Sequence, residues 1–112
     1  MLPWMHEKIR AELKSRALEA PGDTDGGLRA AVQNAVADLA RGSDAGINAL
    51  DETIRPFVEA VARHAYAIED HDVERLRAGP YSEAATFEIT VNAAVAAGLE
   101  RLSIAMETWE KV

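Results

Sequence analysis

The chain has 112 residues, of which 48% are hydrophobic, enough to bury the core of a single domain spanning residues 1–112. Nineteen acidic residues against twelve basic ones give a net charge of −7, which disfavours binding to nucleic acid or to an anionic membrane surface. The chain has no cysteine, which excludes disulfides, thiolate nucleophiles and sulfur-ligated metals.

The N-terminal part is predicted to form helices separated by short breakers. Pro3 suits the first position of a helix whose apolar residues recur with a period near 3.6, at Trp4, Ile9, Leu13, Ala17 and Leu18. The run PGDTDGG at residues 21–27 ends this helix. A second helix is expected from about Leu28 to Leu39, where RGSDAG interrupts it, and a third segment follows. Charges interrupt the first helix throughout, so we expect neither a signal peptide nor a membrane span, and a cytoplasmic protein.

Three further helices are predicted in the C-terminal half. One begins close to Pro56, because proline is tolerated in the first turn of a helix. A shorter one has Asp70 as its N-cap and stops at Gly79, which Pro80 follows. The last is capped by Ser82 and runs through Lys111. No segment alternates with a period of two, so the fold class is predicted to be all-α.

The last helix has more apolar surface than one face can use. We predict that its core-facing stripe consists of Ala84, Phe87, Val91, Ala94, Gly98, Leu102, Ala105 and Trp109. Ile89, Val95, Leu99 and Ile104 would then point elsewhere, and the small residues around Gly98 would let another backbone approach closely. Two interpretations are compatible with this pattern: a central helix surrounded by its own domain, and a helix that also lines a subunit interface.

The run AGPYSEAATFEITVNAAVAAGLERLSIAME resembles the C-terminal signature of the alkyl hydroperoxidase D-like, or carboxymuconolactone decarboxylase, superfamily. The resemblance covers about residues 50–106 and implies an alkyl hydroperoxidase D-like helical bundle with a long C-terminal helix. Redox members carry a glutamate, eleven residues, Cys-x-x-Cys, three residues and a histidine, with a glycine eight residues beyond. Aligned on Gly79, this pattern puts the glutamate at Glu52, the cysteine positions at His64 and Ala67, and the histidine at His71.

Both cysteines of the redox motif are therefore missing. Peroxide reduction in those members needs a thiolate and a resolving thiol, which histidine and alanine cannot replace, so we expect no thiol-dependent peroxidase activity. The chain still has residue types that can transfer protons. Imidazole titrates near neutral pH, and partial burial can raise the pKa of a glutamate toward neutral pH. The candidate catalytic residues are His71, His64 and Glu52, and lactone decarboxylases of the same superfamily work by acid/base chemistry without redox cysteines.

A simpler interpretation is that the histidines are solvated or structural. If Asp70 caps a new helix, His64 and His71 lie on separate helices, and their spacing of seven residues is accidental. A metal site needs three or four converging ligands, and this region offers two histidines, so no metal and no cofactor are predicted. His6 stands alone in the first helix and is expected at the surface.

The sequence thus leads to two hypotheses about function. The first is an oligomeric binding or accessory protein that is not an enzyme, a homo-oligomer for which the resemblance implies a trimer or a hexamer. The second is a cysteine-free acid/base enzyme acting on a small organic substrate, in the manner of a lactone decarboxylase. A small-molecule ligand is a candidate partner under both hypotheses, whereas neither nucleic acid nor a membrane is.

Overall fold

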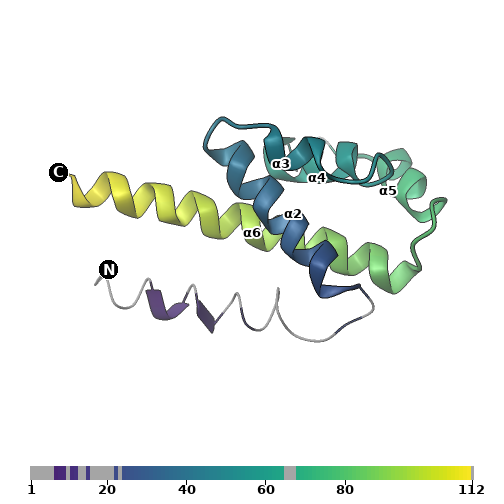
Figure 1. The fold of residues 1–112 in the computed structure, drawn as a ribbon, viewed down its shortest axis with the longest axis horizontal. Coiled ribbons are helices and arrows are strands. Elements are labelled where there is room, and N and C mark those ends of the chain that lie inside the picture. The colour runs from purple at the N-terminus through teal and green to yellow at the C-terminus, as the bar shows by residue number, and fades with distance from the viewer. Residues whose placement is uncertain are drawn as a thin grey trace.

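The computed structural model describes residues 7–9, 11–12, 15, 22, 24–64 and 68–111, and across them the chain is all-α with no strand (Figure 1). The helices after the N-terminal segment are α2 (Gly26–Ala40), α3 (Ala45–Asn48), α4 (Arg55–His64), α5 (Asp70–Arg77) and α6 (Glu83–Glu110). The expected all-α fold with a long C-terminal helix is therefore confirmed.

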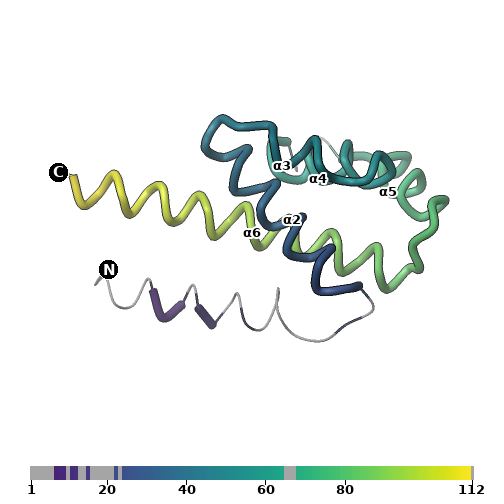
Figure 2. The backbone as a smooth tube through the Cα atoms, viewed as in Figure 1, coloured from purple at the N-terminus to yellow at the C-terminus, as the bar shows by residue number. Residues whose placement is uncertain are grey.

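Helix α6 is the axis on which the other elements are arranged. Its 28 residues correspond to about 42 Å of helix, close to the 46 Å long dimension of the molecule. Helix α2 crosses α6 and also packs against α3 and α4, while α4 and α5 lie together at one end of the bundle and both contact α6 (Figures 1 and 2). The C-terminal end of α6 extends past the rest of the bundle.

One continuous hydrophobic core lies between α6 and the shorter helices. Its largest fully buried side chains, Ile54, Leu76 and Ile89, are each no more than 1% exposed. On the α6 side the core is lined by several alanines in addition to Ile89. Because alanine side chains are short, α2 and α4 can come close to α6 along this face. The buried part of the core comprises Val32, Ala35, Val36, Ile47, Leu50, Ile54, Phe57, Val58, Val61, Leu76, Ile89, Ala93, Ala96 and Ala97.

The orientation of α6 is opposite to the one predicted from the sequence. Ile89 and Leu99, which were expected to point elsewhere, are buried. Phe87 and Trp109, assigned to the core-facing stripe, are 69% and 73% exposed. The predicted core-facing stripe is therefore wrong, because all eight of its members are exposed or only half-buried. Apart from Ala84 in the first turn of the helix, they form what is here called the outer α6 stripe: Phe87, Val91, Ala94, Gly98, Leu102, Ala105 and Trp109.

Most helix boundaries lie where the sequence predicts them. Helix α2 begins at Gly26, two residues before the expected Leu28. Asp25 is its N-cap, and the Asp25 carboxylate accepts the Gly27 N–H. Ser82 Oγ accepts the Ala85 N–H at 3.0 Å and caps α6 as predicted. Pro56 lies in the first turn of α4.

One cap prediction is wrong by a single residue. The N-cap of α5 is Glu69, and Asp70 is the first residue of the helix. The Glu69 N–H donates to Asp72 Oδ2 at 3.0 Å, so the carboxylate at the third helical position binds back to the cap in the manner of a capping box. Asp70 instead places a negative charge in the first turn, where the helix dipole favours it.

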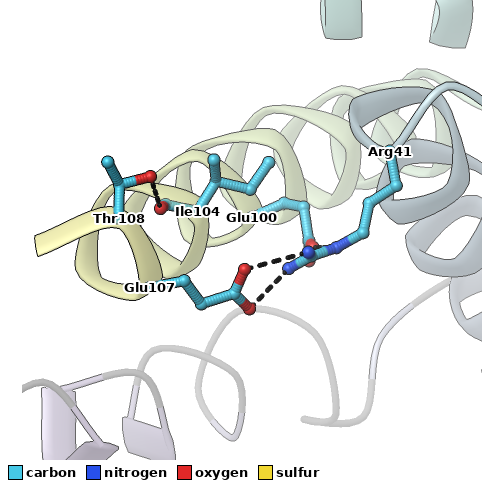
Figure 3. A network of polar contacts seen from close by, with 5 residues as sticks. All are labelled: Arg41, Glu100, Ile104, Glu107 and Thr108. Carbon is cyan, nitrogen blue, oxygen red and sulfur yellow. Dashed lines mark hydrogen bonds and ion pairs between the residues drawn. The ribbon is translucent and has the colours of Figure 1, made fainter. Parts of the chain in front are cut away.

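The C-terminal end of α2 is tied to α6 by a three-residue ionic network (Figure 3). Gly42, with φ at +87°, lets the chain turn after α2, and Ser43 and Gly42 donate their N–H groups to the carbonyls of Asp38 and Leu39. The turn directs Arg41 toward α6.

In this network the Arg41 guanidinium contacts two carboxylates of α6. Arg41 Nε donates to Glu100 Oε1 at 2.7 Å, and its two terminal nitrogens donate to Glu107 at 3.0 and 2.9 Å. The hydrogen bonds to Glu107 and then to Glu100 hold the pKa of Arg41 above its ordinary value. Glu100 and Glu107 are seven residues apart and share a helix face, so one guanidinium can reach both.

The predicted first helix falls mainly outside the described residues. Of its apolar positions only Ile9 is described; it is helical and 41% exposed. Pro3, Trp4, Leu13, Ala17 and Leu18 lie outside the description, as do His6 and Ala67. The predictions made for these residues stay predictions.

Among the described helices, α6 is long and apolar enough to cross a membrane by length and composition. The core helix of a soluble protein meets the same criterion, and 44% of the relevant window is buried against the rest of the chain. Buried polar residues such as Asn92 and Glu100 lie on its inner face. The expectations of no membrane span and a cytoplasmic location stay predictions.

The reversed orientation of α6 predicts unequal effects of two alanine substitutions. Ile89→Ala removes a fully buried side chain and should lower the free energy of unfolding by about 2–5 kcal/mol. Phe87→Ala removes an exposed one and should change the stability of the monomer by about 0.5 kcal/mol or less. Chemical denaturation at low protein concentration measures both, and a larger loss for Phe87→Ala would contradict the orientation.

Candidate functional site

The three predicted site residues lie at separate places around α4 and α5. Glu52 is exposed in the turn before α4, His64 is the last residue of α4, and His71 is the second residue of α5. From Arg55 to His64 the helix rises by about 14 Å, which keeps Glu52 and His64 at opposite ends of α4. The two histidines lie on different helices, as the helix start near Asp70 predicted.

Glu52 lines a pocket between the N-terminal end of α4 and α5, here called the α4–α5 pocket. It is a half-open cavity of about 310 Å³ with an apolar floor that includes Phe57 and Leu76. Its charged groups are Glu52, Asp72 and Arg75. The complete lining is Glu52, Thr53, Pro56, Phe57, Asp72, Arg75 and Leu76.

His71 is connected to this pocket through Asp72. The Nε2 atom of His71 lies 3.4 Å from Asp72 Oδ1, and its Nδ1 lies 3.4 Å from Glu69 Oε2. The imidazole itself is 63% exposed, so it sits at the rim in contact with water. Protonated His71 would pair with both carboxylates, whereas neutral His71 could form only weaker, uncharged contacts with them.

The loop that carries Glu52 is held in place by Asp51. Asp51 Oδ1 accepts the Thr53 N–H at 3.0 Å, and the Tyr81 hydroxyl donates to Asp51 Oδ2 at 3.3 Å. The hydrogen bond from Thr53, reinforced by Tyr81, lowers the pKa of Asp51 below its usual range. Burial, followed by the charge of Asp51, raises the pKa of Tyr81, so this residue stays a neutral donor at physiological pH.

His64 belongs to a second pocket between α2, the end of α4 and α6, here called the α2–α6 pocket. Its volume is about 470 Å³ and its walls are mainly aliphatic, with two arginines and His64 at the edge. Arg101 Nη2 donates to the Ala62 carbonyl at 2.6 Å and so helps to join α6 to the end of α4. The lining residues are Val36, Leu39, Ala40, Ala62, Arg63, His64, Ala97, Arg101 and Ile104.

The structure thus places Glu52 in one pocket, His64 in another, and His71 at the rim of the first. No three His, Asp or Glu side chains within the described part of the chain are grouped so that they could hold a metal ion. The α4–α5 pocket brings together Glu52, Asp72 and Arg75, and the last two were not predicted. Asp72 and Arg75 are three residues apart in the sequence and share a face of α5, but nothing in that spacing shows which face meets α4.

The outer α6 stripe carries two of the three large hydrophobic side chains that are exposed among the described residues, Phe87 and Trp109. It extends from Phe87 to Trp109, about 33 Å along the helix, and both end residues are aromatic and exposed. Within the seven positions of this stripe there is no charged residue. Exposed aromatic side chains on an uncharged stripe of a helix are typical of a protein–protein contact.

Comparison of the chain with protein-family models, with curated proteins and with solved structures found no match. The resemblance to the alkyl hydroperoxidase D-like superfamily therefore rests on the residues quoted for it above.

The lowered pKa of Asp51 predicts a pH dependence of stability. A carboxylate whose pKa is lower in the folded state stabilises the fold fully above its ordinary value of 3.8, and this contribution is lost as the pH falls through the folded value. Asp51→Asn should therefore be less stable than the wild type at pH 7, and the difference should shrink below about pH 4.

Asp44→Asn is the matched control, because Asp44 precedes α3 without a side-chain capping bond. Thermal unfolding between pH 2.5 and 7 measures the difference. If the loss caused by Asp51→Asn were the same at every pH, the role given to the Asp51 carboxylate would be wrong.

Proposed function

We propose that this chain is an oligomeric, non-redox binding or accessory protein of the alkyl hydroperoxidase D-like kind. The observation that carries the proposal is the outer α6 stripe, with Phe87 69% and Trp109 73% exposed. In a monomer this apolar surface would be in contact with water. Burying the surface in a contact with a partner is favourable, because apolar area is then removed from water.

The composition of the stripe supports a protein partner. Aromatic residues such as Phe87 and Trp109 are enriched in protein interfaces, where they bury a large area with few rotatable bonds. Charged residues are depleted from the buried part of interfaces, and the stripe has none. Resemblance to a superfamily that assembles as trimers or hexamers points in the same direction.

The chemistry available to the chain supports the non-redox part of the proposal. Without cysteine there is no thiolate to attack a peroxide and no second thiol to resolve a sulfenic acid. The positions that resemble the redox motif also line different pockets: His64 lines the α2–α6 pocket and Glu52 lines the α4–α5 pocket. We therefore assign no peroxidase activity to the chain.

Self-association should be visible as mass. Light scattering across a dilution series should give a stable multiple of the 12.1 kDa chain at micromolar concentration. Trp109→Glu should weaken the association by roughly thirtyfold, the effect of losing about 2 kcal/mol at an interface hot spot. Thr108→Glu adds the same charge one residue away, off the stripe, and should have a much smaller effect.

A particle of about 12 kDa at every concentration would refute the oligomer. An oligomer that tolerates Trp109→Glu as well as Thr108→Glu would remove the outer α6 stripe from the interface.

The second candidate function is acid/base chemistry on a small organic substrate in the α4–α5 pocket. It is supported by one arrangement: Glu52 lines the pocket, Arg75 could pair with a substrate carboxylate, and His71 contacts Asp72 at the rim. The half-open shape of the pocket and the exposure of His71 count against it, because proton transfer is most effective where water is excluded.

Substitutions of the three candidate catalytic residues separate the two functions. Under the accessory-protein proposal, Glu52→Gln, His64→Asn and His71→Asn should leave helicity and oligomeric mass unchanged, because all three side chains are exposed. Release of carbon dioxide from a carboxylated γ-lactone should not exceed that of a buffer control. Turnover by the wild type that is lost in folded Glu52→Gln or His71→Asn would instead establish the enzyme.

A further inference from the structure

The outer α6 stripe has a symmetry that identifies what can cover it. Its central residue is Gly98, and the other six members lie at equal distances on either side: four, seven and eleven residues away. Ala94 and Leu102 are the nearest pair, Val91 and Ala105 the next, and Phe87 and Trp109 the last. If an antiparallel copy of the same helix is placed against this stripe with the two Gly98 residues opposite each other, every member of the stripe therefore lies at the level of a stripe member of the other copy.

The residues that would meet are complementary in size. In each of the two inner layers a branched residue of one copy lies beside an alanine of the other: Leu102 beside Ala94, and Val91 beside Ala105. At the two ends Phe87 of one copy lies beside Trp109 of the other, so that four aromatic rings close the contact. A pairing of large with small residues fills space without overpacking.

The positions around the helix also fit this arrangement. At about 100° per residue, the two members of each pair lie on opposite sides of a line drawn along the helix surface through Gly98. Their angle from this line is about 40° for the nearest pair and about 20° for the other two pairs. After the twofold rotation, the two residues of a layer, one from each copy, lie side by side at the same height along the helix axis, so their side chains do not collide head-on. This interdigitation is how antiparallel helices pack.

Gly98 leaves room for the second backbone. A methyl group placed at Gly98 would meet no heavy atom of the described residues within 4 Å, so the glycine is not needed for packing inside the subunit. Gly98 lies in an exposed helix interior, where alanine would be more stable by about 1 kcal/mol. Close approach of another helix is a physical reason for glycine at this place.

Charge is consistent with contact between two copies. Two chains that each carry −7 repel one another overall, but the stripe between Phe87 and Trp109 is uncharged. A second copy can therefore dock there without placing like charges in contact. The antiparallel direction also sets the dipole of one helix against that of the other.

We propose that the outer α6 stripe binds a second copy of this chain, antiparallel, with the twofold axis passing beside Gly98. The inference rests on the proposed self-association and adds its geometry. A twofold contact is closed and gives a dimer by itself, or a hexamer when combined with a threefold contact elsewhere. It does not give a trimer by itself.

Cysteine cross-linking tests the register against a clean background, because the natural chain has no cysteine. Val91→Cys and Ala105→Cys change side-chain size little and lie in the same layer of the proposed dimer. Neither variant alone should form a disulfide-linked dimer, because its two copies would be about 21 Å apart along the axis. An equimolar mixture, allowed to exchange and then oxidised, should form the mixed dimer, which intact mass identifies.

A parallel dimer would give the opposite pattern, with each variant cross-linking to itself, and would overturn the inference. A stable oligomer in which neither the single variants nor the mixture cross-link would also overturn it, while leaving the proposed self-association intact. A monomeric wild type would refute both. A chain that stays monomeric but floats with phosphatidylcholine vesicles would show that lipid, and not a second copy, covers the stripe.

Substitution of Gly98 supplies a second, independent test. Gly98→Leu should leave the fold of the subunit intact, since the described residues leave the space open, but should weaken self-association by roughly ten- to a hundredfold. Gly98→Ala is the matched control and should weaken it much less. Equal association of both variants, measured by light scattering at matched helicity, would contradict a twofold axis at Gly98.

Discussion

The fold depends on the burial of one face of α6. Ile89 and the alanines of this face, among them Ala93 and Ala97, are removed from water by helices α2 and α4. Because the alanines are short, the neighbouring helices come close, and a few large side chains such as Ile54 and Leu76 fill the remaining space. The Arg41 network then joins the end of α2 to α6 near the point where the core ends.

The same helix carries the feature that most needs a functional explanation. Helices α2, α4 and α5 pack against one face of the 28-residue α6 and leave Phe87 and Trp109 on the opposite face exposed. That face is apolar, uncharged and symmetric about Gly98, whereas both pockets are half-open and separate the residues that acid/base chemistry would have to combine. The physical arguments therefore favour self-association over catalysis.

The sequence predicted the helices well and the faces of α6 poorly, for one physical reason. Caps and breakers act locally, so Ser82, Pro56 and Gly79 could be interpreted without knowing the rest of the fold. The period of α6, in contrast, fits two opposite stripes, because alanine and branched residues occur on both sides. The positions of α2 and α4 decide which of the two stripes faces the core. The distance between Glu52 and His64 likewise depends on the tertiary structure and cannot be predicted from their spacing in the sequence.

The most direct measurement is the fluorescence of Trp109 across a dilution series. The chain has two tryptophans, so Trp4→Phe leaves Trp109 as the single indole, at the end of the outer α6 stripe. If a second copy covers the stripe, the emission should be shifted to the blue at high concentration and move to the red on dilution, with the same midpoint as the fall in mass. Emission typical of a water-exposed indole at every concentration would contradict the account.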